Sequence, residues 1–331
     1  MLYKHVVIKP LSTFHSLNKY LLRSMAQTPP DPTHILHNQS GQVTALATFR
    51  MKEGGEETLV SGSNNGVISI WNLNVYRSFK TWQAHSGSIV WLGALDDRPG
   101  YIISQARHES IIVWNEKEIA VYHLLVNHEG FCKCDLWTNI IAIPAEKNSV
   151  HIFSINHTSS LERTSTLKID DGEGALMVIK LLEQRSKIAT AYESGCICIW
   201  NENIVLHRTR VKSMPTCLGH HAHRNELLLG TSCETLYIFN ADNLTELKSI
   251  ELTNPGLNAI ALRLSDSRVY ATAGWDKRIR FFSARTHKKL CVLQIHEEAV
   301  NSLVFIAGPG SGLLAAGGSD ALISLWDVYS S

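Results

Sequence analysis

Two cysteine pairs are the first residues of this chain whose type and spacing could do chemistry. Cys132 and Cys134, and likewise Cys196 and Cys198, are separated by a single residue. Side chains two residues apart lie on the same face of a strand, so each pair would present two sulfurs to one side, as half of a zinc site. A structural zinc site needs four ligands, and its paired cysteines are usually separated by about two to four residues. We therefore interpret both pairs as small buried side chains.

A histidine cluster and a glycine-rich segment are the other candidates. His220, His221 and His223 could form a surface metal site or a pH sensor. No carboxylate or thiol stands at a ligand spacing, and we favour a solvated hairpin. Residues 308–312 read GPGSG, without the Lys-Ser/Thr pair or the helix that a phosphate-binding loop needs. Because no catalytic triad or carboxylate pair can be assigned, we predict a non-enzyme with no metal and no cofactor.

Bulk composition argues against two classes of partner. The chain has 331 residues, of which 44% are hydrophobic, and a net charge of +1. The near-neutral balance argues against nucleic acid, and no apolar run approaches the roughly eighteen residues that span a membrane. Seven cysteines at irregular spacing, without a secretory signal, indicate a reducing compartment.

The elements that must position any site follow from a phrase that occurs seven times. Each copy has a short apolar run, a polar turn, an alternating strand and a final aromatic residue; the clearest copy, residues 313–327, reads LLAAGGSDALISLWD. The final aromatics are 39 to 47 residues apart, at Trp71, Trp114, Phe153, Trp200, Phe239, Phe282 and Trp326. This period is typical of propellers with four strands per blade. The sequence predicts an all-β, seven-bladed WD-repeat β-propeller.

The two ends of the chain are expected to meet in the last blade. Only five residues follow Trp326, too few for a fourth strand, whereas residues 34–36 form a short run before the first complete unit. Because a propeller must cover its edge strands, we predict that residues 34–36 supply the outer strand of the last blade. The propeller domain is then 29–331.

Residues 1–28 form an N-terminal extension that contains no Asp or Glu. Three interpretations stay open: a mobile tail, a mitochondrial presequence, or a leader upstream of a functional start at Met25.

Many WD repeats contain a buried bond network in which a histidine contacts a turn acid and a hydroxyl. The candidates are the histidines His85, His128 and His296, the turn acids Asp276 and Asp320 with Asn65 as a substitute, and the hydroxyls Ser61 and Thr272. In blade 7 the expected hydroxyl position holds Ala316. We therefore expect no blade to have the complete network, and modest stability.

A candidate partner-binding surface lies on blade 6. The residues before the turn acids run around the ring as Asn64, Arg107, Glu146, Glu193, Ser232, Trp275 and Ser319. Only Trp275 is a large aromatic, and Trp and Arg are common interface anchors. The alternative is that Trp275 folds onto its own loop. The predicted surface comprises Asn254, Pro255, Trp275, Lys277, Arg278, Glu297 and Glu298.

The same region resembles a known family. The segments 251–256 (ELTNPG), 271–276 (ATAGWD), 278–280 (RIR), 313–317 (LLAAG) and 323–326 (ISLW) are similar to the guanine nucleotide-binding protein beta-subunit-like protein 1 family, which includes the fungal ASTRA-associated WD-repeat protein. The resemblance covers residue 29 to the end. It implies a non-catalytic scaffold, monomeric within a larger assembly. The implied partners are the Triple-T co-chaperone complex and the phosphatidylinositol-3-kinase-related kinases, in the cytoplasm and nucleus.

Three alternative functions stay open. The first is a G-protein beta-like signalling subunit, although residues 1–40 show no heptads for the helix that would bind a γ subunit. The second is a substrate receptor of a cullin ubiquitin ligase, although no third strand ends in Trp-Asp-x-Arg. The third is a propeller enzyme, which would need polar side chains that converge in the channel.

Overall fold

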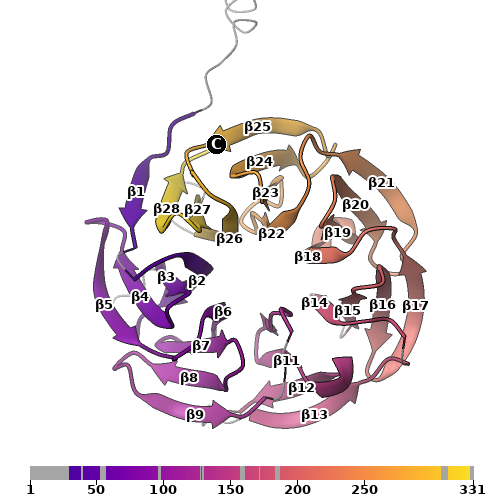
Figure 1. Ribbon diagram of the computed structural model, residues 1–331, viewed down its shortest axis with the longest axis horizontal. Coiled ribbons are helices and arrows are strands. Elements are labelled where there is room, and N and C mark those ends of the chain that lie inside the picture. The colour runs from indigo at the N-terminus through magenta and orange to yellow at the C-terminus, as the bar shows by residue number, and fades with distance from the viewer. Residues whose placement is uncertain are drawn as a thin grey trace, which may run out of the picture.

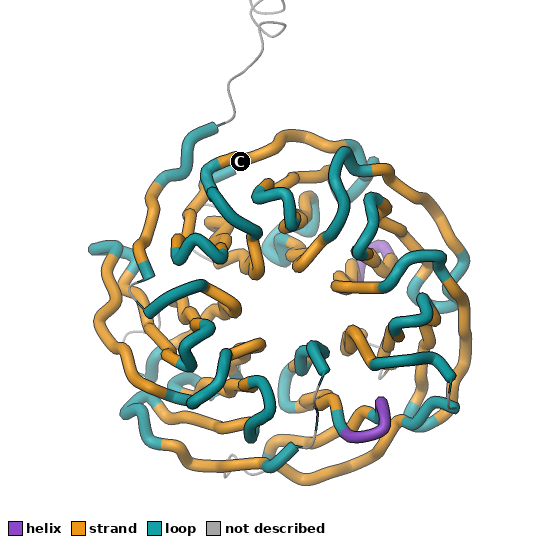
Figure 2. The backbone as a smooth tube through the Cα atoms, viewed as in Figure 1, coloured by secondary structure: helices purple, strands orange, loops and turns teal. Residues whose placement is uncertain are grey.

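The protein is a ring of seven antiparallel sheets around a central axis (Figure 1). The computed structural model describes residues 30–38, 40–52, 57–95, 98–126, 128, 130–156, 161–170, 172–182, 187–306 and 312–328. In this part of the chain every sheet has four strands, and the remaining segments are loops, turns and two short 3-10 helices (Figure 2). The predicted all-β, seven-bladed propeller is confirmed.

Each blade uses four strands that succeed one another from the axis outward. Blades 1 and 2 comprise β2 (Val43–Arg50), β3 (Glu57–Ser63), β4 (Val67–Asn72), β5 (Arg77–Gln83), β6 (Ile89–Ala94), β7 (Tyr101–Ala106), β8 (Ile111–Asn115) and β9 (Ala120–Leu124). Blades 3 and 4 comprise β10 (Asp135–Trp137), β11 (Ile140–Pro144), β12 (Val150–Ile155), β13 (Leu161–Leu167), β14 (Leu176–Leu182), β15 (Lys187–Tyr192), β16 (Cys196–Asn201) and β17 (Ile204–Arg210), with the helix η1 (Glu146–Asn148).

Blades 5 to 7 continue in the same way around the ring. Blades 5 and 6 comprise β18 (Pro215–His221), β19 (Glu226–Thr231), β20 (Thr235–Asn240), β21 (Glu246–Glu251), β22 (Leu257–Leu262), β23 (Val269–Gly274), β24 (Arg278–Ser283) and β25 (Lys289–Gln294), with the helix η2 (Ala222–Arg224). Blade 7 comprises β26 (Val300–Ile306), β27 (Leu313–Gly318), β28 (Leu322–Trp326) and, from the other end of the chain, β1 (His34–His37).

Ring closure follows the prediction. β1 pairs antiparallel with β28, with Leu36 opposite Ile323. The Leu36 side chain is buried in a cluster with Ile323 and Leu325. The predicted extension of residues 1–28, and the three interpretations of it, lie outside the described residues.

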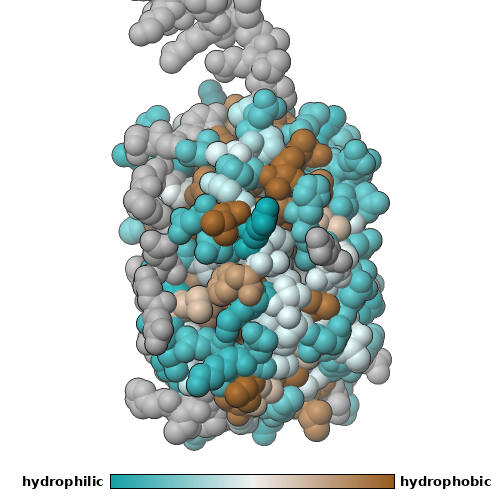
Figure 3. Space-filling model, turned by 90° about the vertical axis from the view of Figure 1, so that its left-hand side faces the viewer, coloured by the Kyte–Doolittle hydropathy of each residue, from teal (hydrophilic) through white to brown (hydrophobic). Residues whose placement is uncertain are grey.

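The core of the molecule lies between the blades. Inner and middle strands are buried on both faces because each blade is sandwiched between two neighbours, as in β28, where Trp326 joins Phe281 and Leu314 in the cluster between blades 6 and 7. Outer strands form the rim and are more exposed, as in β17, where most residues are exposed. On the flank shown in Figure 3, apolar surface forms separate patches among hydrophilic side chains. In the described residues no helix is long and apolar enough to cross a membrane.

Two blades contain the complete polar network, and the prediction that none would was wrong. In blade 7, His296 Nδ1 lies 3.0 Å from an Asp320 carboxylate oxygen, and its Nε2 lies 2.8 Å from Ser324 Oγ. Trp326 Nε1 donates to the same hydroxyl at 2.8 Å. The hydroxyl comes from Ser324 because this residue pairs directly across the sheet with Ala316, so a neighbouring strand fills the expected position.

Blade 2 builds the same network with a longer acid. His85 Nδ1 lies 3.0 Å from Glu109 Oε2, and Nε2 lies 2.7 Å from Ser104 Oγ, which also accepts from Trp114 Nε1 at 2.8 Å. The sequence reasoning considered aspartate and asparagine at the turn and therefore missed Glu109. Buried, fully satisfied networks rigidify a fold, so the reason for expecting modest stability does not apply to these two blades.

Two N-terminal truncations test ring closure. Deleting residues 1–28 retains β1 and its pairing with β28, so the melting temperature should stay almost unchanged. Deleting residues 1–40 removes β1 and exposes the β28 edge, so the protein should melt earlier and aggregate. Circular dichroism melts and light scattering measure both effects. If deleting residues 1–40 lowers the melting temperature no more than deleting residues 1–28, β1 is dispensable.

Trp326 tests the packing between blades 6 and 7. Its side chain is 1% exposed, so Trp326→Ala should lower the free energy of unfolding by about 3–5 kcal/mol in urea titrations. Trp326→Phe keeps an aromatic side chain but loses the hydrogen bond to Ser324, and should lower the free energy of unfolding by about 1–3 kcal/mol. A loss of less than about 3 kcal/mol for Trp326→Ala would contradict the assigned packing.

Candidate interaction surface

The predicted site lies on one face of the ring. In each blade the loop entering the innermost strand and the turn between the second and third strands emerge at the same end, because adjacent strands run antiparallel. We call this end the top face and the opposite end the bottom face. In blade 6 the two segments are joined directly, since Trp275 N donates to Gly256 O at 3.0 Å.

An ion pair holds these two segments together. The Asp276 carboxylate accepts from Arg280 at 3.0 Å on Oδ1 and 2.5 Å on Oδ2, and from Asn254 Nδ2 at 2.8 Å. Arg280 is 2% exposed, and its guanidinium also donates to Thr253 Oγ1 at 3.4 Å. A forked, desolvated pair of this kind has one favoured geometry. The turn and the entering loop are therefore preorganised.

The electrostatics of Asp276 agree with this role. Burial of the Asp276 carboxyl raises its pKa, but hydrogen bonds from Arg280 and Asn254 and the charge of Arg280 outweigh burial, so the net pKa lies below its usual value. The carboxylate is therefore ionised at neutral pH and remains paired with Arg280.

Trp275 folds onto its own loop and is also exposed. Its ring lies over Gly256, where an added Cβ would be 2.0 Å from a ring carbon, and Gly256 has a φ of +84° that favours glycine. Trp275 Nε1 donates to Asn258 Oδ1 at 2.6 Å. The side chain is nevertheless 44% exposed. The packing named as the alternative is present, and it leaves almost half of the residue available at the surface.

Asn258 connects this tryptophan to the next blades. Asn258 Nδ2 donates to Val300 O at 3.0 Å, and Asn301 Nδ2 donates to Val43 O and to Ser319 Oγ, both at 2.9 Å. These bonds link the innermost strands of blades 6, 7 and 1. The sequence reasoning missed both asparagines, since asparagine in an innermost strand has no characteristic spacing.

The other predicted residues share the top face. Pro255 and Lys277 are exposed, and Lys277 has a φ of +69°. Arg278 is half-buried, with a guanidinium nitrogen 3.8 Å from Asp276 Oδ2. Glu297 and Glu298 are exposed in the loop that enters β26, one blade along. Fold and hydrogen bonding bring Asn254, Trp275 and Arg278 together around Asp276 and Gly256, whereas the two glutamates lie on blade 7.

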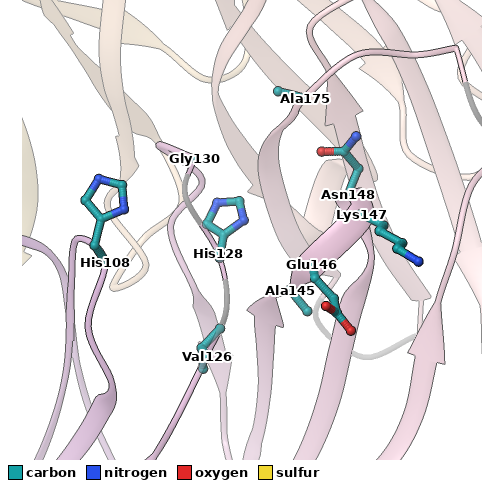
Figure 4. A pocket seen from close by; sticks show the side chains of 9 residues that line it. All are labelled: His108, Val126, His128, Gly130, Ala145, Glu146, Lys147, Asn148 and Ala175. Atoms are coloured by element: carbon teal, nitrogen blue, oxygen red, sulfur yellow. The ribbon is translucent and has the colours of Figure 1, made fainter.

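A cavity that the sequence reasoning missed opens on the same face between blades 2, 3 and 4. It has a volume of about 630 Å³ and is lined by His108, Val126, His128, Gly130, Ala145, Glu146, Lys147, Asn148 and Ala175 (Figure 4). His108, Lys147 and Asn148 have φ of 59°, 53° and 56°. His128, expected in a polar network, lines this cavity instead, and burial lowers its pKa. The cavity is a concave region of the top face, lined by none of the predicted surface residues of blades 6 and 7.

The thiols and histidines that could bear chemistry are distributed differently from the prediction. Cys196 and Cys198 share one face of β16, with sulfurs 3.8 Å apart, and are buried as predicted. Cys132 and Cys134 are also buried, but they precede the short strand β10 and pack into different clusters, so the expectation of one shared strand face was wrong. In the described part of the chain no group of three or more His, Cys, Asp or Glu side chains could hold a metal ion.

The histidine cluster is not simply a solvated hairpin. His220 and His221 end β18 and are each 3% exposed, because this strand is packed between neighbouring blades; only His223 is exposed. The strand therefore extends further than the polar sequence suggested.

Replacing Asp276 tests the preorganisation of blade 6. Asp276→Asn leaves Arg280 buried without its charge partner and should cost about 3 kcal/mol of unfolding free energy at pH 7. Because the folded pKa is depressed, this stabilisation is present above the unfolded pKa of about 3.9 and is lost as pH falls below it. The difference between wild type and variant should therefore shrink from pH 7 to pH 3 in urea titrations.

Asp170→Asn is the matched control. Asp170 is exposed, so its replacement should change stability by less than about 0.5 kcal/mol. The assigned ion pair would be contradicted if the difference in unfolding free energy between Asp276→Asn and wild type stayed constant with pH.

Comparisons with known proteins agree with the architecture. The family model "WD domain, G-beta repeat" matches residues 287–327. Guanine nucleotide-binding protein subunit beta-like protein 1 of Mus musculus is 30% identical over 91% of this chain and 97% of its own length. ASTRA-associated protein 1 of Schizosaccharomyces pombe is 24% identical, and that of Schizosaccharomyces japonicus 22% identical, each over 91% of this chain and 99% of its own length. The chain belongs to the guanine nucleotide-binding protein subunit beta-like protein 1 family.

Proposed function

We propose that this protein is a scaffold that acts with the Triple-T co-chaperone complex in the maturation of phosphatidylinositol-3-kinase-related kinases. The WD-repeat propeller, together with relatives named ASTRA-associated protein 1, supports a scaffold or adaptor. The assignment to the Triple-T complex and to these kinases rests on the family resemblance at blade 6. The proposed setting is the cytoplasm and nucleus, with the protein as one copy within a larger assembly.

The observation that supports this function is the preorganised tryptophan on the top face. Trp275 has its indole N–H satisfied by Asn258, its ring seated on Gly256 and its turn held by the Asp276–Arg280 pair. A partner that covers the exposed part of the ring gains apolar contact and orders few additional side chains. The surface is therefore suited to protein recognition.

The charges around Trp275 suit an oriented contact. Lys277 and Arg278 lie beside it, and Glu297 and Glu298 stand on the neighbouring blade. Opposite charges at the two ends of one surface favour one orientation of a partner over its reverse, since electrostatic complementarity mainly contributes specificity and association rate.

Trp275→Ala should weaken partner capture with little effect on folding. Truncating an interface anchor typically costs about 2 kcal/mol or more, roughly a thirtyfold loss of affinity. Quantitative affinity purification with mass spectrometry should show loss of the co-chaperone subunits and the large kinases. The melting temperature should change little, because Trp275 is already 44% exposed.

Phe79→Ala is the matched control for this experiment. Phe79 is 45% exposed on β5, an outer strand, so its loss removes a comparable aromatic surface away from the top face. If the wild-type protein captures G-protein α and γ subunits, or cullin adaptors, in place of co-chaperones, the proposed function is wrong. Unchanged capture by Trp275→Ala, or early melting of that variant, would show that Trp275 serves packing alone.

A further inference from the structure

The bottom face has a cavity of a different character between blades 5 and 6. It has a volume of about 600 Å³ and is lined by His221, His223, Arg224, Asp266, Ser267, Arg268, Ser283 and Arg285. These residues come from the β18–β19, β22–β23 and β24–β25 connections, all at the end opposite Trp275. The lining contains three arginines and two histidines against a single carboxylate. None of the lining residues is a Phe, Tyr or Trp or a branched aliphatic residue.

Two charged residues of the lining, Asp266 and Arg224, already form ion pairs within the protein. Asp266 accepts from Arg263 at 3.0 Å and 2.7 Å, so its carboxylate is neutralised by a guanidinium that is 4% exposed. Arg224 pairs with the buried Glu226 at 2.9 Å. The single acid of the cavity therefore cannot cancel the charge of the remaining arginines.

Arg268 and Arg285 carry the charges that are most available to a ligand, while the charge of Arg268 also acts on the Asp266 carboxylate. Both are exposed, and among the described residues neither guanidinium forms an ion pair with a carboxylate. The backbone N–H of Arg268 donates to Asp266 Oδ1 at 3.0 Å, which anchors the base of that side chain. Two guanidiniums, with the exposed His223 beside them, give the cavity a local excess of positive charge in a chain whose net charge is +1.

The floor of the cavity is built from buried bonds. His221 Nδ1 accepts from Arg224 N at 3.3 Å, so its Nε2 carries the proton and donates to Ser267 O at 2.9 Å. His221 is 3% exposed. This histidine ties the β18–β19 connection of blade 5 to the β22–β23 connection of blade 6, so the arginines project from a fixed base.

Basic residues continue outward from the cavity along the outer strands of blades 5 and 6. Lys288 and Lys289 are exposed at the start of β25, and Lys248 of β21 donates from Nζ to Thr286 O at 2.9 Å. An extended anionic chain seated in the cavity would meet these lysines next. A compact soluble ligand would use only the cavity.

We propose that this cavity binds a phosphorylated, acidic segment of a protein partner. The phosphate of a phosphoserine or phosphothreonine carries a charge of about −1.5 to −2 near neutral pH, which matches the two arginines Arg268 and Arg285. Guanidiniums bind phosphate through paired N–H donors, and arginine clusters are a recurring mode of phosphopeptide recognition. Acidic residues beside the phosphate then lie along Lys288 and Lys289.

This binding is independent of the proposed co-chaperone role. It uses the bottom face and involves neither Trp275 nor the Asp276–Arg280 pair.

Fluorescence anisotropy with the full-length protein tests the proposal. The probe is a labelled peptide with one phosphoserine flanked by aspartates, compared with its unphosphorylated form. We expect the phosphopeptide to bind at least about tenfold more tightly, with an affinity that falls as salt rises. The double variant Arg268→Gln/Arg285→Gln should lose at least about tenfold in affinity, whereas Arg268→Lys/Arg285→Lys should retain part of it because the charge remains but the paired donors are lost.

The matched control is Arg77→Gln/Arg163→Gln, which removes two positive charges from exposed positions on β5 and β13. It should bind the phosphopeptide like wild type, and so should Trp275→Ala. Circular dichroism melts verify that every variant is folded. Equal binding of the two peptides, or an equal loss in the control pair, would overturn the proposal. Binding of inositol hexakisphosphate without binding of the phosphopeptide would also overturn it, by assigning the cavity to a soluble phosphate.

Discussion

The antiparallel pairing of β1 with β28 is the contact on which the rest of the molecule depends. A single four-stranded blade exposes two apolar faces, and it can bury both only between two neighbours. A closed ring gives every blade two neighbours, and β1 supplies the last outer strand from the opposite end of the chain. The inter-blade clusters that bury Trp326, Leu36 and the other core side chains exist only in that closed arrangement.

Blade 6 departs from the polar network of blades 2 and 7, and the candidate surface lies where it departs. In blade 7, Ser324 pairs across the sheet with Ala316 and completes the histidine network. The matching position in blade 6 holds Arg280, which pairs with Thr272 in the same register. This longer side chain reaches the turn acid Asp276 directly and also contacts Thr253, so no histidine is needed. The exchange of a histidine-centred network for a buried arginine–aspartate pair shapes the top of the blade that presents Trp275.

The two faces of the ring then offer chemically different surfaces. The top face combines a half-exposed aromatic side chain with mixed charges and a cavity between blades 2, 3 and 4. On the bottom face, the cavity between blades 5 and 6 is lined by three arginines and two histidines against one carboxylate. A scaffold that holds partners on opposite faces keeps them apart at a fixed distance, because the packed blades between them are rigid.

Local pattern in the sequence determined the blade count, the position of most strands, the closing role of residues 34–36 and the placement of Trp275 in an exposed turn, because repeats and strand periodicity are properties of consecutive residues. Tertiary structure alone decided which hydroxyl completes each network, since Ser324 stands on a different strand from the expected Ala316. It also decided that Cys132 and Cys134 pack into different clusters, and that Arg268 and Arg285 share a cavity with His221 from another blade. These arrangements join segments far apart in the chain, and their geometry is set by how the blades pack around the ring.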